Sequence, residues 1–437
     1  MKNFIQPFFC VALLVRLILM PITMHADLLF VNYFPSFLSY HGVWDIYGYF
    51  GDHFLKYNFT YYPPLVYYLT ALAQWLVKAV NPGFDVLMSH VHGVIYFEKG
   101  ISSPAHDYLA PFSIFQRLQF VFWMKSPYLV ADGFCLWVIS KLSLQTASGS
   151  GDFLLKSWLF DPVLLFSIYI FGQYRIYSAL FIWLVIYFLE KRKIALASFI
   201  VGVMCLADNF PFALLLPAVL IFGKSWKERA VFFLTALSPV IFLLTPLVVS
   251  SKGYVFYSYA SPLIQKLASQ GILRHYPEVI GPICKGIFLS TFLFTLFCLC
   301  RKKNNNPTAT KQLFIYVSLA LLFVIYATST TSVHYFMWAL PFFSILRCEG
   351  EPWPRVYSGA LVALLFLFNL DSRALNLGLF MPLDPGYFMS LPSLHEIAAR
   401  YGPWGGFIGL CRLGFSFICL YFAIEIYRKR IRPLLRF

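Results

Sequence analysis

A carboxylate and an imidazole lie immediately after the first apolar segment of the chain. His25 and Asp27 follow the run 4–22 by only a few residues. A carboxylate in a poorly hydrated site has a raised proton affinity, or it pairs with a cation or a metal ion. In such a site Asp27 could take a proton from an incoming hydroxyl group. The other interpretation is an ordinary helix cap or a solvated loop aspartate, and position alone leaves both open.

Residues that could bind an anion recur further along the chain. Gln173 and Arg175 lie between two apolar segments. A buried arginine there needs an anion such as a carboxylate, a lipid head group or a phosphate. His334 begins another apolar segment, where an imidazole could donate to a phosphate oxygen or orient a base. Lys125 and His275 are further candidates. The plainer interpretations are an arginine near lipid phosphates, a lysine that only sets topology, and interfacial histidines.

The elements that must position these residues are membrane helices. Of the 437 residues, 59% are hydrophobic and only 12% are charged, whereas a soluble domain contains about 25% charged residues. No polar stretch is long enough to bury a core of its own. We therefore expect an all-α, polytopic membrane protein in which residues 1–437 form a single integral membrane domain.

The charge and cysteine patterns narrow the class of partner and cofactor. The net charge of +15 comes from basic clusters at the ends of apolar runs, which is typical of topology signals rather than of nucleic-acid binding. The nine cysteines show neither metal-ligand spacing nor a disulfide framework. No cofactor is expected, although Asp27, Asp45 and Asp52 in one loop leave a divalent metal possible.

Apolar segments long enough to cross a membrane occur along the whole chain. A span needs about 20 residues, and the total expected here is about 12 spans. The run 194–222 is interrupted near Asp208, which predicts two short helices that meet on the outer side. Two half-length helices, 113–124 and 127–140, are expected around Lys125, and 335–347 is a short return span. The remaining candidates are 4–22, 62–80, 153–172, 174–190, 230–250, 283–300, 312–330, 356–370 and 404–427.

Basic clusters fix the expected orientation, because such clusters stay on the cytoplasmic side. The loops 23–61, 251–282 and 371–403 then fall outside. The first of these carries Asp27, and 251–282 is a candidate substrate lid. Tyr62 opens a helix at the interface, since the prolines after it favour a first helical turn. Candidate site residues therefore converge on the outer face.

The order of these motifs resembles the GT-C superfamily of multi-span glycosyltransferases, which use lipid-phosphate-linked sugars. Asp27 matches the catalytic aspartate that this family places in its first outer loop, and Tyr62-Pro63-Pro64-Leu65 matches the turn opening the second span. Within that superfamily, the sequence most resembles the branch of dolichyl-phosphate-glucose glucosyltransferases and their bacterial relatives. The matching motifs there are Asn81-Pro82, Lys125-Ser126-Pro127 with Asp132, Asp161-Pro162 with Gln173-Tyr174, and His334-Tyr335-Phe336 with Leu340-Pro341. Arg175 departs from that branch, which has asparagine there.

The resemblance implies an inverting transfer of a sugar from a polyprenyl-phosphate donor to a hydroxyl acceptor on a glycan, lipid or protein. Asp27 would act as general base, and His334, Arg175 and Lys125 would hold the leaving phosphate, with Gln173, Tyr62 and His275 as further substrate contacts. The expected location is a bacterial plasma membrane, or alternatively the endoplasmic reticulum membrane. The alternative function is a transporter or flippase for lipid-linked sugars, because Asp132 and Asp208 fall inside apolar runs.

Overall fold

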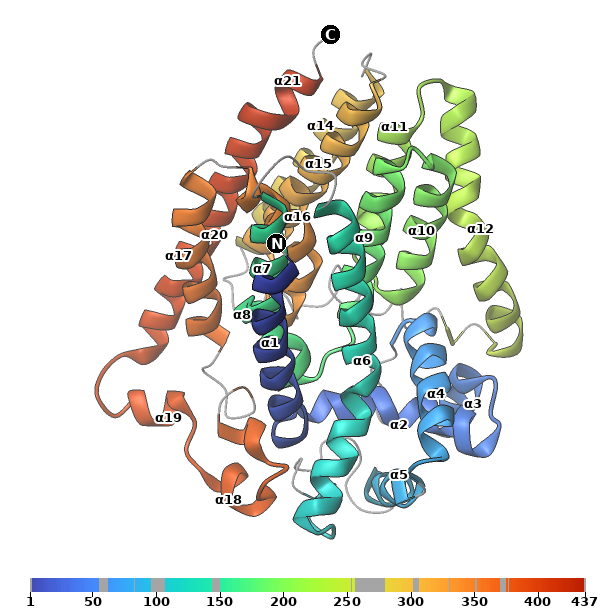
Figure 1. The fold of residues 1–437 in the computed structure, drawn as a ribbon, viewed down its shortest axis with the longest axis vertical. Helices are drawn as coiled ribbons and strands as arrows, with labels where there is room; N and C mark the ends of the chain where they lie inside the picture. The colour runs from blue at the N-terminus through green and yellow to red at the C-terminus, as the bar shows by residue number, and fades with distance from the viewer. Residues whose placement is uncertain are drawn as a thin grey trace.

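The computed structural model describes residues 2–54, 62–81, 83–95, 107–143, 150–252, 254–255, 280–301, 306–329, 331–349, 352–369, 375 and 377–435. Within these ranges every regular element is a helix, as the apolar sequence predicts (Figure 1). The first half contains α1 (Lys2–Ile22), α2 (Ala26–His41), α3 (Ile46–Phe54), α4 (Pro64–Lys78), α5 (Gly83–Gly93), α6 (Ile114–Ser143), α7 (Ser150–Leu159), α8 (Pro162–Leu164), the π-helix η4 (Leu165–Phe171), α9 (Ile176–Glu190), α10 (Ile194–Ala207) and α11 (Pro211–Phe222).

The second half of the chain continues the helical bundle. Its long helices pack on one another in the order α15 against α20 and α20 against α17, with α14 beside α15 and α11. The elements are α12 (Trp226–Ser250), α14 (Ile280–Cys300), α15 (Pro307–Thr328), the 3-10 helix η5 (Val333–Trp338), α16 (Leu340–Cys348), α17 (Pro352–Asn369), the 3-10 helix η7 (Leu377–Phe380), α18 (Pro385–Ser390), α19 (Leu394–Ala398), α20 (Trp404–Ile426), the π-helix η8 (Tyr427–Ile431) and α21 (Arg432–Leu434).

Several of these helices are apolar enough to lie in a membrane. Within the described residues, four are also long enough to cross it: Gly151–Phe171, Trp226–Ser250, Thr308–Thr328 and Trp404–Leu434. Shorter apolar helices of 10–17 residues accompany them. The chain is thus an all-helical protein with membrane-type helices, whereas the expected total of about 12 spans is not confirmed.

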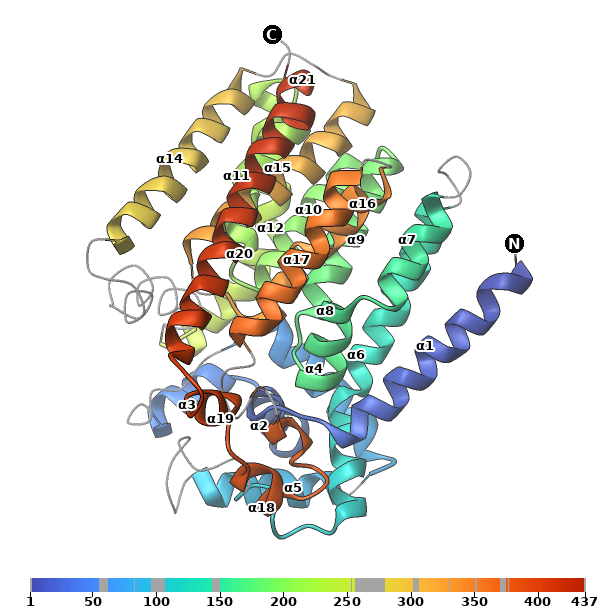
Figure 2. The ribbon, with the colours of Figure 1, turned by 90° about the vertical axis from the view of Figure 1, so that its left-hand side faces the viewer.

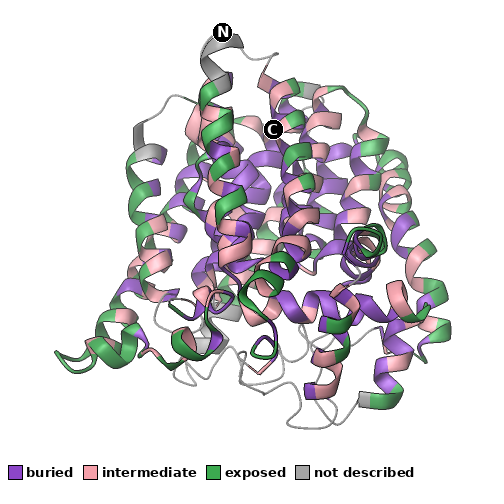
Figure 3. Ribbon diagram, turned by 60° about the horizontal axis from the view of Figure 1, so that its bottom comes forward, coloured by how far each residue is buried: buried purple, intermediate pink, exposed green. Residues whose placement is uncertain are grey.

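Exposed side chains support a membrane setting. Figure 3 shows buried turns along the inner sides of the bundle and exposed turns along its outward faces. Many of the exposed side chains are large and apolar, such as Phe242 on α12, which is 83% exposed, and Phe417 on α20, which is 63% exposed. Hydrocarbon chains of a bilayer would cover such surfaces without cost.

The bundle has two chemically different ends. The turn 191–193 and the C-terminal basic stretch 428–432 lie at one of them, here called the basic end (top of Figure 1). Ion pairs hold that end together: Lys311 with Glu190, and Arg430 with Glu349 at 2.9 Å. The opposite end, here called the site end, gathers α2, α3, α5, α18 and α19 (Figure 2).

The first two helices meet at a sharp bend. The axes of 7–22 and 26–41 differ by 79°, and the pair counts as a fifth candidate span only when taken as one broken span. α2 therefore lies across the site end rather than along the bundle (Figure 1). His25 causes the bend, because it leaves the helical conformation and caps α2 with its side chain.

α6 corrects one expectation. Its residues form one helix, Ile114–Ser143, that continues through Pro127, so the prediction of two half-length helices with an apex at Lys125 is wrong. Proline removes the backbone donor that would bond the carbonyl four residues earlier. Here the Ser126 hydroxyl donates to that carbonyl, Trp123 O, at 2.8 Å. A neighbouring hydroxyl commonly satisfies the freed group in membrane helices, which is why the helix continues.

Candidate functional site

Asp27 lies in the first turn of α2, directly after the bend. The His25 Nδ1 accepts a hydrogen bond from the Asp27 backbone N–H at 3.2 Å and lies 3.4 Å from Asp27 Oδ1. The chain just before α2 is held from two sides, since Met24 N donates to Leu379 O and His25 N donates to Phe171 O. The Asp27 side chain is 38% exposed. Asp27 is thus a first-turn residue of α2 whose backbone N–H is capped by His25, and its carboxylate can be reached by an external molecule.

Gln173 joins Asp27 to the middle of the chain. Its Nε2 donates to Asp27 Oδ2 at 2.8 Å, and its Oε1 accepts from Arg175 Nη1 at 2.8 Å. Gly172 makes this approach possible, because it adopts φ +89° at the end of η4 and its backbone lies against Leu28 and Lys125. A side chain at 172 would be strained by that φ value and would crowd both neighbours.

Arg175 is buried at the start of α9 among aromatic rings. Its guanidinium carbon lies 4.1 Å from the ring centre of Tyr335, 5.1 Å from that of Tyr174 and 5.6 Å from that of Trp338. Such cation–π contacts are stronger where water is excluded. Arg175 Nε has no hydrogen-bond partner among the described residues, so one donor of this buried cation is not used.

Asp208 supplies the nearest buried negative charge. It follows α10, and its Oδ2 lies 3.8 Å from Arg175 Nε. The same oxygen accepts hydrogen bonds from Trp338 Nε1 at 2.8 Å and from Ser178 Oγ at 3.2 Å. The interruption in the run 194–222 brings the Asp208 carboxylate close to Arg175 at the site end. The two short helices α10 and α11 meet there, as the sequence predicts.

His334 and Tyr62 border this network. The His334 imidazole is 8% exposed and lies 4.8 Å from the Phe171 ring, which stacks on His25 at 4.1 Å. Tyr62 contacts the Tyr174 ring edge-on, with 5.4 Å between the ring centres. The structure thus brings five of the predicted site residues to one place: Asp27, Gln173, Arg175, His334 and Tyr62.

Lys125 occupies a different kind of position. It is fully buried in the middle of α6, and its Nζ donates to backbone carbonyls of Thr23, of Tyr169 at 2.6 Å and of Ile170 at 3.2 Å. The Thr23 carbonyl directly follows α1, and the Tyr169 and Ile170 carbonyls lie in the last turn of η4. These two segments lead into Asp27 and Gln173. Lys125 therefore holds the backbone on both sides of the site, and its donors are already in use.

The other predicted contacts lie outside this network. His275 and most of the expected lid, 251–282, lie outside the described residues. Asp52 forms an exposed ion pair with Lys252 at 2.9 Å, and Asp45 accepts a hydrogen bond from the Gly48 N–H at 2.9 Å. Within the described ranges, no group of three or more histidine, cysteine or acidic side chains could hold a metal ion.

The surroundings of Asp27 favour its ionised form. Partial burial alone would raise its pKa, but the interactions with His25, the positive charge of Arg175 and the Gln173 amide outweigh it. They hold the pKa of Asp27 below its ordinary value. Asp27 at the site end is therefore an ionised, hydrogen-bonded carboxylate at neutral pH.

The comparisons with known proteins do not assign the chain to a family. No protein-family model matches it, and neither a curated protein nor a solved structure matches it. The resemblance to the GT-C superfamily therefore rests on the sequence motifs alone.

Two groups of buried polar residues were not among the site residues expected from the sequence: Asp208 with Trp338, and Arg16 with Asp132. Asp208 was predicted as an interruption of the run 194–222, Trp338 was not singled out, and nothing in the sequence linked either residue to Arg175. Arg16 is the clearer omission, because a lone arginine inside an apolar helix is itself a signal of a buried partner. That partner is Asp132, whose Oδ2 accepts a hydrogen bond from Arg16 Nε at 2.8 Å.

Proposed function

We propose that the protein is a membrane glycosyltransferase that moves a sugar from a polyprenyl-phosphate donor to a hydroxyl acceptor on a glycan, lipid or protein. The observation that carries the proposal is the chain of contacts from the accessible Asp27 carboxylate through Gln173 to the buried Arg175 cation. A carboxylate that could act as a base and a cation that could bind an anion are thus joined through one side chain, which supports the proposal. The basic clusters lie at the opposite end, so this site belongs to the outer face.

The proposed reaction uses Asp27 as general base. The acceptor hydroxyl attacks the anomeric carbon of the donor sugar while Asp27 takes its proton. The bond between that carbon and the phosphate oxygen breaks, and polyprenyl phosphate leaves with the bonding electrons. Attack from the side opposite the phosphate inverts the anomeric configuration. Asp27 can accept this proton because it is ionised and because 38% of its side chain is exposed. Its lowered pKa makes it a weaker base than a free carboxylate, so the proton is transferred as the new bond to the anomeric carbon forms.

Arg175 and His334 are the proposed partners of the leaving phosphate. Arg175 has a rigid planar guanidinium, which suits phosphate oxygens; its Nε makes no hydrogen bond among the described residues and lies 3.8 Å from Asp208 Oδ2. His334 lies against Phe171, the residue that also packs on His25. Donors held in place before the reaction stabilise negative charge as it develops. We assign Lys125 to positioning instead, because its donors bind backbone carbonyls.

A transporter of lipid-linked sugars is less well supported. An ion or proton pathway needs charged groups that can change partners within the membrane. Asp132 is instead enclosed by three donors, the side chains of Arg16, Trp158 and Tyr169, at 2.7–2.8 Å. Asp208 is likewise bonded to Trp338 and Ser178.

A donor screen in proteoliposomes tests the proposal. Purified protein receives a hydroxyl acceptor and a panel of polyprenyl-phosphate sugars, and released polyprenyl phosphate is measured. Asp27→Asn should lower the rate by roughly 10²–10⁴-fold, which is the usual contribution of a general base. Asp52→Asn, which removes an exposed carboxylate at the same end, should have nearly normal activity. Normal transfer by Asp27→Asn would remove the general-base assignment, and transbilayer movement of every donor without phosphate release would favour a transporter.

A further inference from the structure

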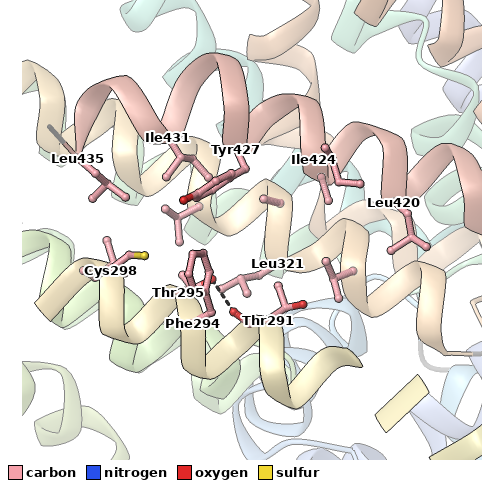
Figure 4. Close-up of a pocket in the computed structure, with 15 residues that line it drawn as sticks. Thr291, Phe294, Thr295, Cys298, Leu321, Leu420, Ile424, Tyr427, Ile431 and Leu435 are labelled. Carbon is pink, nitrogen blue, oxygen red and sulfur yellow. Dashed lines mark hydrogen bonds between the residues drawn. The ribbon is translucent and has the colours of Figure 1, made fainter. Parts of the chain in front are cut away.

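An apolar groove at the basic end is separate from the site described above. It lies where α14 and the α20–η8 helix both pack on α15, and it has a cavity volume of about 330 Å³ (Figure 4). That volume falls in the lower part of the range of small-molecule sites. The lining is almost entirely aliphatic and aromatic, with Leu321 at the base and Ile424 and Ile431 on one wall. It therefore fits a hydrocarbon chain rather than a polar ligand.

The groove is long enough to hold an acyl chain of one leaflet. On its α20–η8 wall the lining runs from Leu420 to Leu435, which spans about 22 Å at the rise of a regular helix. Half of a bilayer's hydrocarbon core is about 15 Å thick. The wall includes the π-helical turn η8, with Tyr427 and Ile431 facing the groove. π-helical turns inside longer helices are frequent at functional sites.

Two cations that form no ion pair among the described residues lie next to lining residues of the groove. Arg301 directly follows α14, three residues after the lining residue Cys298, and its guanidinium lies 4.1 Å from the centre of the Phe297 ring. Arg432 directly follows the lining residue Ile431. Both are exposed, and neither has a carboxylate partner among the described residues. By contrast, Arg428, Lys429 and Arg430 are paired with Glu425 or Glu349 at 2.9–3.0 Å. The groove thus combines an apolar slot with positive charge at the membrane surface.

We propose that this groove binds an anionic glycerophospholipid of the leaflet at the basic end. One acyl chain fills the slot between α14, α15 and α20, and the phosphate lies between Arg301 and Arg432. Charge complementarity selects the head group, because an anionic lipid surface attracts each nearby cation. The basic end is the cytoplasmic end by the distribution of positive charge. The proposal does not depend on the glycosyltransferase assignment, since the groove and the Asp27 site lie at opposite ends.

Native mass spectrometry of the full-length protein in detergent tests the lipid site. The protein is titrated with phosphatidylglycerol, phosphatidylcholine or polyprenyl phosphate of similar mass. We expect phosphatidylglycerol to bind most tightly. Arg301→Gln combined with Arg432→Gln should weaken that binding by roughly tenfold or more and leave phosphatidylcholine unchanged. Lys224→Gln with Lys227→Gln removes the same charge at the same end, away from the groove, and should retain the preference.

A second variant tests the slot itself. Ala320 lines the groove on α15, and Ala320→Phe should fill the space and reduce phosphatidylglycerol binding without changing the charge at the mouth. Unchanged binding in both the charge variant and Ala320→Phe would overturn the proposal. Polyprenyl phosphate that binds more tightly than phosphatidylglycerol, and that loses this binding in Arg301→Gln with Arg432→Gln, would overturn it too. Transfer activity of the same samples reports on the Asp27 site, so failure of one proposal is distinguishable from failure of the other.

Discussion

The Gln173 amide connects Asp27 to Arg175 although Gln173 and Asp27 are 146 positions apart in sequence. Its nitrogen donates to the carboxylate and its oxygen accepts from the guanidinium, so the orientation of the amide is fixed by both partners. Asp27 Oδ2 is therefore occupied. Oδ1, which lies 3.4 Å from His25 Nδ1, is the oxygen that remains for an acceptor hydroxyl.

This contact predicts a change in the pH dependence of transfer. The Gln173 amide is among the interactions that hold the pKa of Asp27 below its ordinary value, which is about 3.9 in model peptides. As pH falls, wild-type kcat/KM should therefore lose its Asp27-dependent part only below about pH 4. Gln173→Leu removes the donor and should move this acid limb to higher pH. Gln116→Leu, at an exposed helix start, should leave it in place.

Much of this architecture could be predicted from the sequence. Apolar runs indicated helices near 4–22, 174–190, 230–250 and 404–427, and helices occur in each place. The number of membrane crossings could not be counted from the sequence, because several apolar helices are shorter than the thickness of a bilayer and pack against neighbouring helices. Asp27, Gln173 and Arg175 could be recognised by residue type and by their place at helix ends.

Pairings across the chain could not be predicted. The bond from Arg16 to Asp132 crosses 116 positions, and hydropathy carries no information about which buried charges meet. The break expected at Pro127 failed for a local reason, since hydropathy and proline position do not reveal that Ser126 replaces the lost hydrogen bond.

Arg175 is predicted to depend on its planar shape as well as on its charge. Arg175→Lys keeps a cation, but an ammonium group cannot stack on Tyr335 while bonding the Gln173 oxygen. Donor KM should rise by about tenfold or more, because donor phosphate binding weakens. Steady-state kinetics with varied donor would measure this. Arg428→Lys makes the same change at the basic end and should leave KM unaltered, whereas an unaltered KM in Arg175→Lys would exclude Arg175 from the phosphate site.

Lys125 provides a test that separates positioning from phosphate binding. Lys125→Met keeps much of the side-chain volume but removes the Lys125 donor from the carbonyls of Thr23, Tyr169 and Ile170. The Tyr169 carbonyl keeps the Thr23 hydroxyl as a donor at 3.1 Å. Each buried carbonyl that loses its partner costs about 1–3 kcal/mol. We expect a lower unfolding temperature together with a loss of transfer. Lys141→Met, near the exposed end of the same helix, should affect neither. A variant with normal stability and weakened donor binding would return Lys125 to the phosphate site.

The Arg16–Asp132 pair should stabilise the packing of α1 on α6. Asp132 accepts from Arg16, Trp158 and Tyr169, so Asp132→Leu leaves the Arg16 charge buried without a carboxylate. Removing one partner of a buried pair typically costs about 3–5 kcal/mol, and replacing both with apolar residues costs much less. Thermal unfolding of the purified protein should therefore show a large loss for Asp132→Leu and partial recovery for Arg16→Met with Asp132→Leu. Recovery would show that the pair is structural, whereas additive losses in the double variant would contradict a direct coupling. Loss of transfer in a double variant with recovered stability would assign the pair a role in the reaction as well.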